Sequence, residues 1–98
     1  MVKLTFKSTE EFTNLFTSKK KKVTDAIVEG IESAMNKKKR TADLFEVTFE
    51  EAEQMFEITL PSVEWETALT AALDHYHSIE ANDECIDTWQ LLEKVKSL

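Results

Sequence analysis

The scarcity of glycine and proline limits the possible folds of this chain more than any other feature of its sequence. Gly30 is the only glycine and Pro61 the only proline among 98 residues. Because these residues interrupt helices and strands and form most tight turns, a chain with one of each consists mainly of regular elements joined by short polar connections. Its length matches one domain, residues 1–98, and is sufficient for one core without disulfides or metal.

The N-terminal residues predict a strand followed by a short helix. Apolar side chains alternate from Val2 to Phe6, which is the period of a half-buried strand. In the sequence that follows, the Ser8 hydroxyl can accept a hydrogen bond from the Glu11 N–H while the Glu11 carboxylate reaches back to Ser8. This capping box predicts a helix that extends to about Thr17.

A longer amphipathic helix is predicted from about Lys20 to Lys38. Its apolar positions recur every four residues, at Val23, Ile27, Ile31 and Met35. Gly30 lies inside this helix, where glycine is less favourable than alanine by about 1 kcal/mol. We therefore expect Gly30 to allow close packing against another element.

Two alternating segments in the middle of the chain predict a β-hairpin. Residues Phe45–Glu50 and Phe56–Leu60 alternate apolar with polar side chains, which gives the hairpin one apolar and one acidic face. The connection Glu51–Gln54 lacks the Asn-Gly or Asp-Gly of a tight turn, so the sequence leaves the register open. A helix over residues 49–57 is the alternative interpretation.

Two further helices are predicted after the hairpin. Pro61 ends the second strand, and Ser62 is placed to cap a helix whose apolar stripe runs from Trp65 to Ile79. Asn82-Asp83 interrupts this pattern, and a last helix with apolar positions from Ile86 to Val95 should fold back as an antiparallel partner. The predicted fold is α+β, a small antiparallel sheet (the N-terminal strand plus the β-hairpin) packed by four helices in the order β-α-α-β-β-α-α.

Charge is divided along the chain. Residues 1–40 carry ten Lys/Arg and five Asp/Glu, whereas residues 41–98 carry two and fourteen, for a net charge of −7. Most of the cations form two runs, Lys19, Lys20, Lys21 and Lys22, and Lys37, Lys38, Lys39 and Arg40. The second run follows the C-terminal end of the long predicted helix, where the helix dipole favours cations. The first run crowds the start of that helix, so it either caps the end of the preceding helix or binds an anion.

The two cationic runs could bind nucleic acid or another anion, and this is the alternative function. They are separated by about 27 Å along a helix, however, and therefore mark the two ends of one rod. No aromatic residues are interleaved with them to stack on bases. The net negative charge would also repel a polyphosphate, so we expect nucleic-acid binding less than protein binding.

The acidic middle of the chain is the predicted partner-binding surface. In the hairpin, Glu46, Glu50 and Glu57 should project from the face opposite the core. Such a surface can dock on a basic groove of another protein or imitate the phosphates of DNA, and a solvated face that interacts with nothing is the structural alternative. The predicted binding residues are Glu46, Glu50, Glu51, Glu53, Glu57, Glu64 and Glu66.

Residues that could carry catalysis or bind a metal do not combine into a site. His75 and His77 are two positions apart and point about 200° apart on a helix, so they cannot share one ion. Cys85 is surrounded by acidic residues, which disfavour the reactive thiolate, and is interpreted as a small buried hydrophobe. We predict no metal, no cofactor and no enzymatic activity.

The large aromatic residues of the last two helices are assigned to the core by their helical phase. Of Trp65, Tyr76 and Trp89, the last is best placed to be an exposed anchor for a partner, because aromatic residues concentrate at interface hot spots.

Together these features predict a small acidic interaction protein that binds and modulates or inhibits a protein with a basic surface, for example in the manner of a bacteriophage inhibitor of a host protein. Self-association through the two charge halves is a further possibility. The single cysteine fits a reducing compartment, and no segment approaches the ~18 apolar residues of a membrane span, so we expect a cytoplasmic protein without membrane contact.

Overall fold

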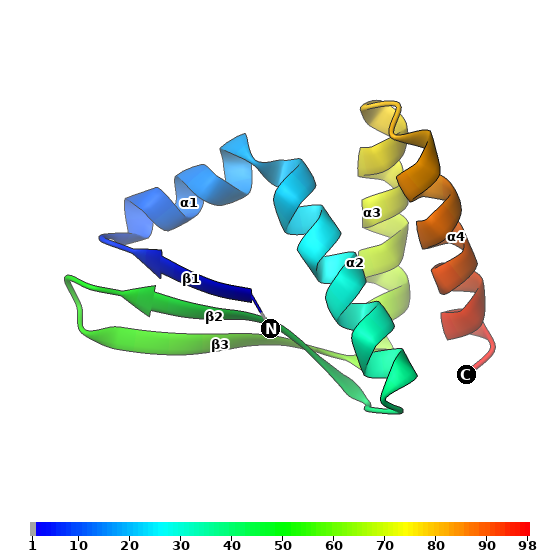
Figure 1. Cartoon of the computed structure of the whole chain (residues 1–98), viewed down its shortest axis with the longest axis horizontal. Helices are drawn as coiled ribbons and strands as arrows, with labels where there is room; N and C mark the ends of the chain where they lie inside the picture. The colour runs from blue at the N-terminus through cyan, green and yellow to red at the C-terminus, as the bar shows by residue number, and fades with distance from the viewer. Residues whose placement is uncertain (1) are drawn as a thin grey trace.

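The computed structural model describes residues 2–98, and its fold is α+β with the predicted order of elements (Figure 1). The elements are β1 (Val2–Phe6), α1 (Thr9–Ser18), α2 (Lys20–Asn36), β2 (Thr41–Phe49), β3 (Gln54–Pro61), the single-turn 3₁₀ helix η1 (Ser62–Glu64), α3 (Trp65–Ser78) and α4 (Asn82–Lys96). Figure 1 shows α1 and α2 beside the sheet, with α3 and α4 standing side by side at its end. Within the described residues, no helix is long and apolar enough to cross a membrane.

The sheet is mixed, whereas an antiparallel sheet was expected. Its strand order is β1-β2-β3, with β2 and β3 paired antiparallel and β1 paired parallel to β2. The chain between β1 and β2 contains both α1 and α2, and such a helical crossover returns it to the sheet in the same direction. A direct turn would have been needed to make that pair antiparallel.

The β-hairpin is confirmed, and the alternative helix over residues 49–57 is wrong. Phe49 pairs with Gln54 across the turn, and Glu53 in that turn has a positive φ of 51°. A bulge interrupts the register between Asp43 and Phe45, so Leu44 is the extra residue on β2. Because the bulge shifts the alternation by one position, Leu44 and Phe45 are both buried.

Two predicted capping interactions take a different form. Ser8 makes no side-chain hydrogen bond at the start of α1; the Glu11 carboxylate instead accepts from the Lys7 N–H at 2.8 Å. Ser62 likewise does not cap α3 with its side chain but begins η1. Its N–H donates to the Arg40 carbonyl at 2.7 Å, which joins the end of the hairpin to the loop that follows α2.

Gly30 allows α2 to approach β2 closely, as expected. A Cβ atom at this position would lie 2.6 Å from Cδ2 of Leu44. The hydrophobic core that includes Leu44 also contains Ile31, Val47 and Leu69, all of which have almost no exposed surface. Trp65 closes the end of this core, and its indole N–H donates to the Leu60 carbonyl at 2.8 Å.

The molecule is flat. Its principal extents are 43 × 31 × 16 Å, and its radius of gyration is 14.1 Å, against about 12.6 Å for a typical chain of this length. The accessible surface is 6734 Å², about 1,000 Å² more than the roughly 5,700 Å² typical of this mass. This shape leaves one face of the sheet and the outer faces of α3 and α4 uncovered by other elements.

Candidate functional site

Two of the seven predicted glutamates lie side by side on the uncovered face of the sheet. Glu46 of β2 pairs directly with Glu57 of β3, and both point away from the face that packs on the helices. Carboxylates directly opposite each other on neighbouring strands repel, so this pair is unfavourable for folding. Lys3 is the neighbour of Glu46 on β1 and offsets part of that charge.

The other five predicted glutamates occupy the two ends of β3. Glu50, Glu51 and Glu53 belong to the β2–β3 turn, whereas Glu64 lies in η1 and Glu66 in the first turn of α3. The eight residues of β3 span about 26 Å, so the seven side chains do not form one continuous patch. Among residues 2–98, no ion pair involves any of them.

The two cationic runs lie at opposite ends of α2. Lys19 separates α1 from α2 and its N–H donates to the Leu15 carbonyl, so this run both ends α1 and begins α2. The run at residues 37–40 follows the C-terminal end of α2, and its Lys39 forms an ion pair with Asp43 at 3.7 Å.

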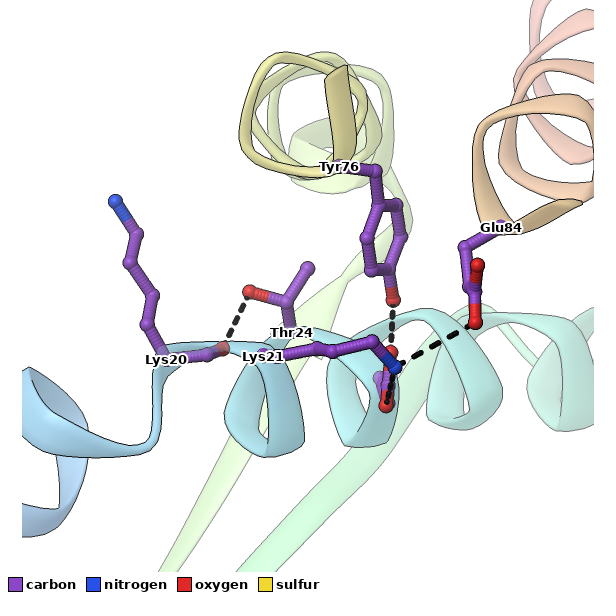
Figure 2. Close-up of polar contacts among 6 residues, drawn as sticks. Lys20, Lys21, Thr24, Tyr76 and Glu84 are labelled. Carbon is purple, nitrogen blue, oxygen red and sulfur yellow. Dashed lines mark hydrogen bonds and ion pairs between the residues drawn. The ribbon is translucent and has the colours of Figure 1, made fainter. Parts of the chain in front are cut away.

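Lys21 is the centre of a polar network that joins three helices (Figure 2). Its Nζ lies 3.1 Å from the Asp25 carboxylate on α2 and 3.5 Å from the Glu84 carboxylate on α4. The Tyr76 hydroxyl, which points down from α3, donates to the other Asp25 oxygen at 2.5 Å. The two carboxylates thereby neutralise the charge of Lys21, one of the cations that crowd the start of α2. The network also links α2 to α3 and α4.

The network raises the pKa of two of its members. The hydrogen bond to Asp25 raises the pKa of Lys21 above its ordinary value of 10.5. Burial raises the pKa of Tyr76 far above its ordinary value of 10.0, and the hydrogen bond to Asp25 raises it further. Both groups therefore keep their protons to a higher pH in the folded protein than in the unfolded chain.

The carboxylates of α2 and α4 surround a groove of about 320 Å³ between these helices, which we call the acidic groove. Five carboxylates line it: Asp25, Glu29, Glu32, Glu84 and Asp87. Lys21 is the only cation among the described residues with an ion pair to any of them, and its partners are Asp25 and Glu84. Glu29, Glu32 and Asp87 are exposed and form no ion pair within residues 2–98.

Reasoning from the sequence missed the acidic groove because its residues come from two distant segments. The spacing of Asp25, Glu29 and Glu32 places them on one face of α2, and Glu84 and Asp87 share a face of α4. These spacings were a detectable signal for each helix alone. Nothing in the sequence showed that the two faces would meet.

A second groove lies between α3 and α4, and we call it the apolar groove. Its volume is about 590 Å³, and it is lined by Leu73, Asp74, His77, Cys85, Ile86, Trp89 and Gln90. Trp89 is 55% exposed and Ile86 56% exposed, whereas Trp65 and Tyr76 are buried in the core. The core assignment made from helical phase is therefore correct for Trp65 and Tyr76 and wrong for Trp89, which matches the alternative of an exposed anchor.

The described residues contain no group of three or more His, Cys, Asp or Glu side chains arranged to hold a metal ion. His77 is exposed beside the apolar groove. His75 points to the other side of α3, where its Nε2 is buried without a hydrogen-bond partner among residues 2–98. Cys85 is a half-buried free thiol.

Comparison with protein-family models, with curated proteins and with solved structures found no match to this chain. The geometry and charge of the two grooves and of the hairpin are therefore the features that bear on function.

Proposed function

We propose that this protein is a small acidic interaction protein that binds a protein partner with a basic surface and thereby modulates or blocks it. The observation that carries this proposal is the acidic groove, where five carboxylates from two helices meet and a single lysine pairs with two of them. Carboxylates held on rigid helices attract a cationic surface over a long range and fix its orientation on contact.

The flat shape of the molecule supports a binding role. A chain of this mass normally exposes about 1,000 Å² less surface, and a standard interface buries about 800 Å² on each partner. The surplus surface here is therefore of the size that one protein partner covers.

The glutamates of the hairpin are a second contact region for the same partner. Glu46 and Glu57 destabilise the sheet by facing each other, and the three glutamates of the turn concentrate charge at one end of the molecule. A basic partner would relieve the repulsion in both places.

The structure supports the alternative of nucleic-acid or anion binding less well: Lys37 and Lys39 line a hollow of about 260 Å³, but Glu29 and Asp43 line it too. The cationic runs occupy opposite ends of α2, about 26 Å apart, and Lys21 and Lys39 already form ion pairs with carboxylates of the same chain.

The test uses two triple charge reversals with the same change in net charge. One variant carries Glu29→Lys, Glu32→Lys and Asp87→Lys in the acidic groove; the other carries Glu46→Lys, Glu50→Lys and Glu57→Lys in the hairpin. Each tagged protein, with the wild type, is used for affinity capture from a cell lysate at low salt and at about 0.5 M salt, where charge interactions are screened.

We expect wild type to capture a basic protein that about 0.5 M salt releases, because the contact is largely electrostatic. The groove variant should lose this capture, and the hairpin variant should weaken it. Capture unchanged in both variants, or recovery of nucleic acid in place of a protein, would contradict the proposed function.

A further inference from the structure

The apolar groove exposes two large apolar side chains next to each other on the outer face of the molecule. Ile86 and Trp89 are one turn apart on α4, and each exposes more than half of its surface. Leu73 of α3 forms the opposite wall of the groove. Clustered exposed apolar side chains are uncommon on a monomer, and tryptophan is the residue most enriched at the energetic centres of interfaces.

The charge around this groove selects a cationic occupant. Asp74 lines the groove from α3, and Glu93 follows Trp89 by one turn on the exposed side of α4. Glu84 and Asp87 of α4 line the acidic groove instead, and no lysine or arginine precedes Lys94 and Lys96 in the last turn of α4. A second copy of this chain would bring the same carboxylates against these, so the charges oppose self-association here.

The shape of the groove selects an extended, rigid occupant. Sites for small molecules bury most of the ligand, whereas here the two principal side chains lie more than half exposed and form an open trough. The residues that line the trough belong to α3 and α4, and these two helices stand side by side (Figure 1). A third helix fits such a trough, since its apolar side chains at positions i, i+3 and i+4 can insert between the two ridges.

We propose that the apolar groove binds one amphipathic helix of the basic partner. Its apolar face packs on Trp89 and Ile86, and its lysine or arginine side chains pair with Asp74 and Glu93. This inference rests on the proposed function in one respect, namely that the partner is a basic protein. Beyond that function, it specifies that a helix of the partner is recognised and that Trp89 and Ile86 are the residues that anchor it.

The test uses two synthetic helical peptides of the same length and the same leucine pattern. One carries lysine at all polar positions and the other carries glutamate. Binding is followed by the side-chain N–H signals of the two tryptophans in nuclear magnetic resonance spectra, with the Trp89 signal assigned from its loss in Trp89→Phe. We expect the lysine peptide to shift the Trp89 signal and leave that of the buried Trp65 unchanged.

Variants then locate the bound peptide. Trp89→Ala and Ile86→Ala should each weaken binding of the lysine peptide by about tenfold or more, as expected for anchor residues. The double reversal Asp74→Lys and Glu93→Lys should remove the preference for the lysine peptide. The control Val63→Ala deletes another exposed apolar side chain, outside the groove, and should bind like wild type. Circular dichroism and urea unfolding verify that each variant is folded.

Three outcomes would overturn the inference: equal binding of both peptides, binding that Trp89→Ala does not weaken, or a dimer in sedimentation that Trp89→Ala abolishes.

The inference and the proposed function can also fail separately. A basic protein captured equally by wild type and Trp89→Ala overturns the inference and leaves the proposed function standing. If the lysine peptide binds at Trp89 but no basic protein is captured from a lysate, the result supports helix binding in the apolar groove and overturns the proposed function.

Discussion

Among residues 2–98, three residues other than glycine have the left-handed backbone conformation: Lys38, Glu53 and Glu80, with φ between 51° and 58°. Lys38 and Glu80 end helices in the same way. After α2 the Lys39 N–H donates to the Ala34 carbonyl at 2.8 Å, and after α3 the Ala81 N–H donates to the Tyr76 carbonyl at 2.9 Å. These are Schellman motifs, in which glycine normally holds the left-handed position because a Cβ atom there costs about 1 kcal/mol.

Lys38→Gly should therefore stabilise the protein by about 1 kcal/mol, because the Schellman geometry stays and the steric penalty of the Cβ atom disappears. Urea unfolding at pH 7 measures the change. Lys38→Ala is the matched control, since it removes the same charge but keeps the Cβ atom, and it should give no gain. Equal stabilisation by glycine and alanine would show that the charge of Lys38, and not its backbone conformation, is unfavourable.

Tyr76→Phe should destabilise the protein by about 1.5–3 kcal/mol at pH 7, the usual range for a hydrogen bond to a charged group. The pKa of Tyr76 is raised in the folded state, so its contribution to stability is complete below its ordinary value of 10.0 and is lost as pH rises above that value. The raised pKa of Lys21 acts in the same direction. Wild type should thus lose stability above about pH 10, and Tyr76→Phe should lose less.

Tyr76 is the only tyrosine, so tyrosinate absorbance follows its ionisation directly. We expect the folded protein to ionise well above the pH at which the urea-unfolded protein does. Identical titration curves for the two states would contradict the buried hydrogen bond to Asp25.

At the scale of elements, the contact between α2 and β2 depends on Gly30 and Leu44. Gly30→Ala improves helix propensity by about 1 kcal/mol, but its methyl group would overlap the buried Leu44 side chain, and repacking of that kind costs typically 1–3 kcal/mol. The single variant should therefore be destabilised by about 1 kcal/mol.

A double-mutant cycle tests this contact. Leu44→Ala removes the atom that the new methyl group would meet, so Gly30→Ala should become stabilising in that background. Urea unfolding of the four proteins gives the coupling free energy. An additive cycle would show that Leu44 does not limit the approach of α2 to β2.

The sequence predicted most elements because their signals are local. The four-residue spacing of α2 and the alternation in β2 and β3 require only that one face of each element be apolar. The phase change at Leu44-Phe45 was also visible as two adjacent apolar residues, and a bulge explains it. The direction of β1 relative to β2 was not predicted, since it depends on how a crossover of two helices packs.

At the scale of the whole molecule, stability should be uneven. Helix α1 has no fully buried residue, whereas α3 buries Trp65, Leu69, Ala72 and Tyr76. Amides of α1 should therefore exchange with solvent through local opening, at least about tenfold faster than those of α3 after correction for intrinsic rates. Hydrogen exchange measures this difference. Equal protection of the two helices would mean that α1 opens only when the whole protein unfolds.

For the candidate site, too, features set by neighbouring residues could be predicted from the sequence, and features set by contacts between distant segments could not. The acidity of the chain could be read from residue types, whereas helical phase assigned Trp89 to the core and only the packing of α3 on α4 leaves it exposed. The main concentration of carboxylates was expected in the hairpin, but carboxylates from two separate helices meet in the acidic groove. The residues that form it are about 60 positions apart in the chain, and only packing brings them together.

The sequence by itself determined the helices, the strands, their order and the sign of the charge, because each depends on neighbouring residues and on solvation. Only the tertiary structure decided the parallel pairing of β1, the linkage of Lys21, Asp25, Tyr76 and Glu84, and the position of the two grooves. Those features depend on contacts between segments far apart in the chain. Their geometry is set by the way apolar faces pack together, which no short stretch of sequence specifies.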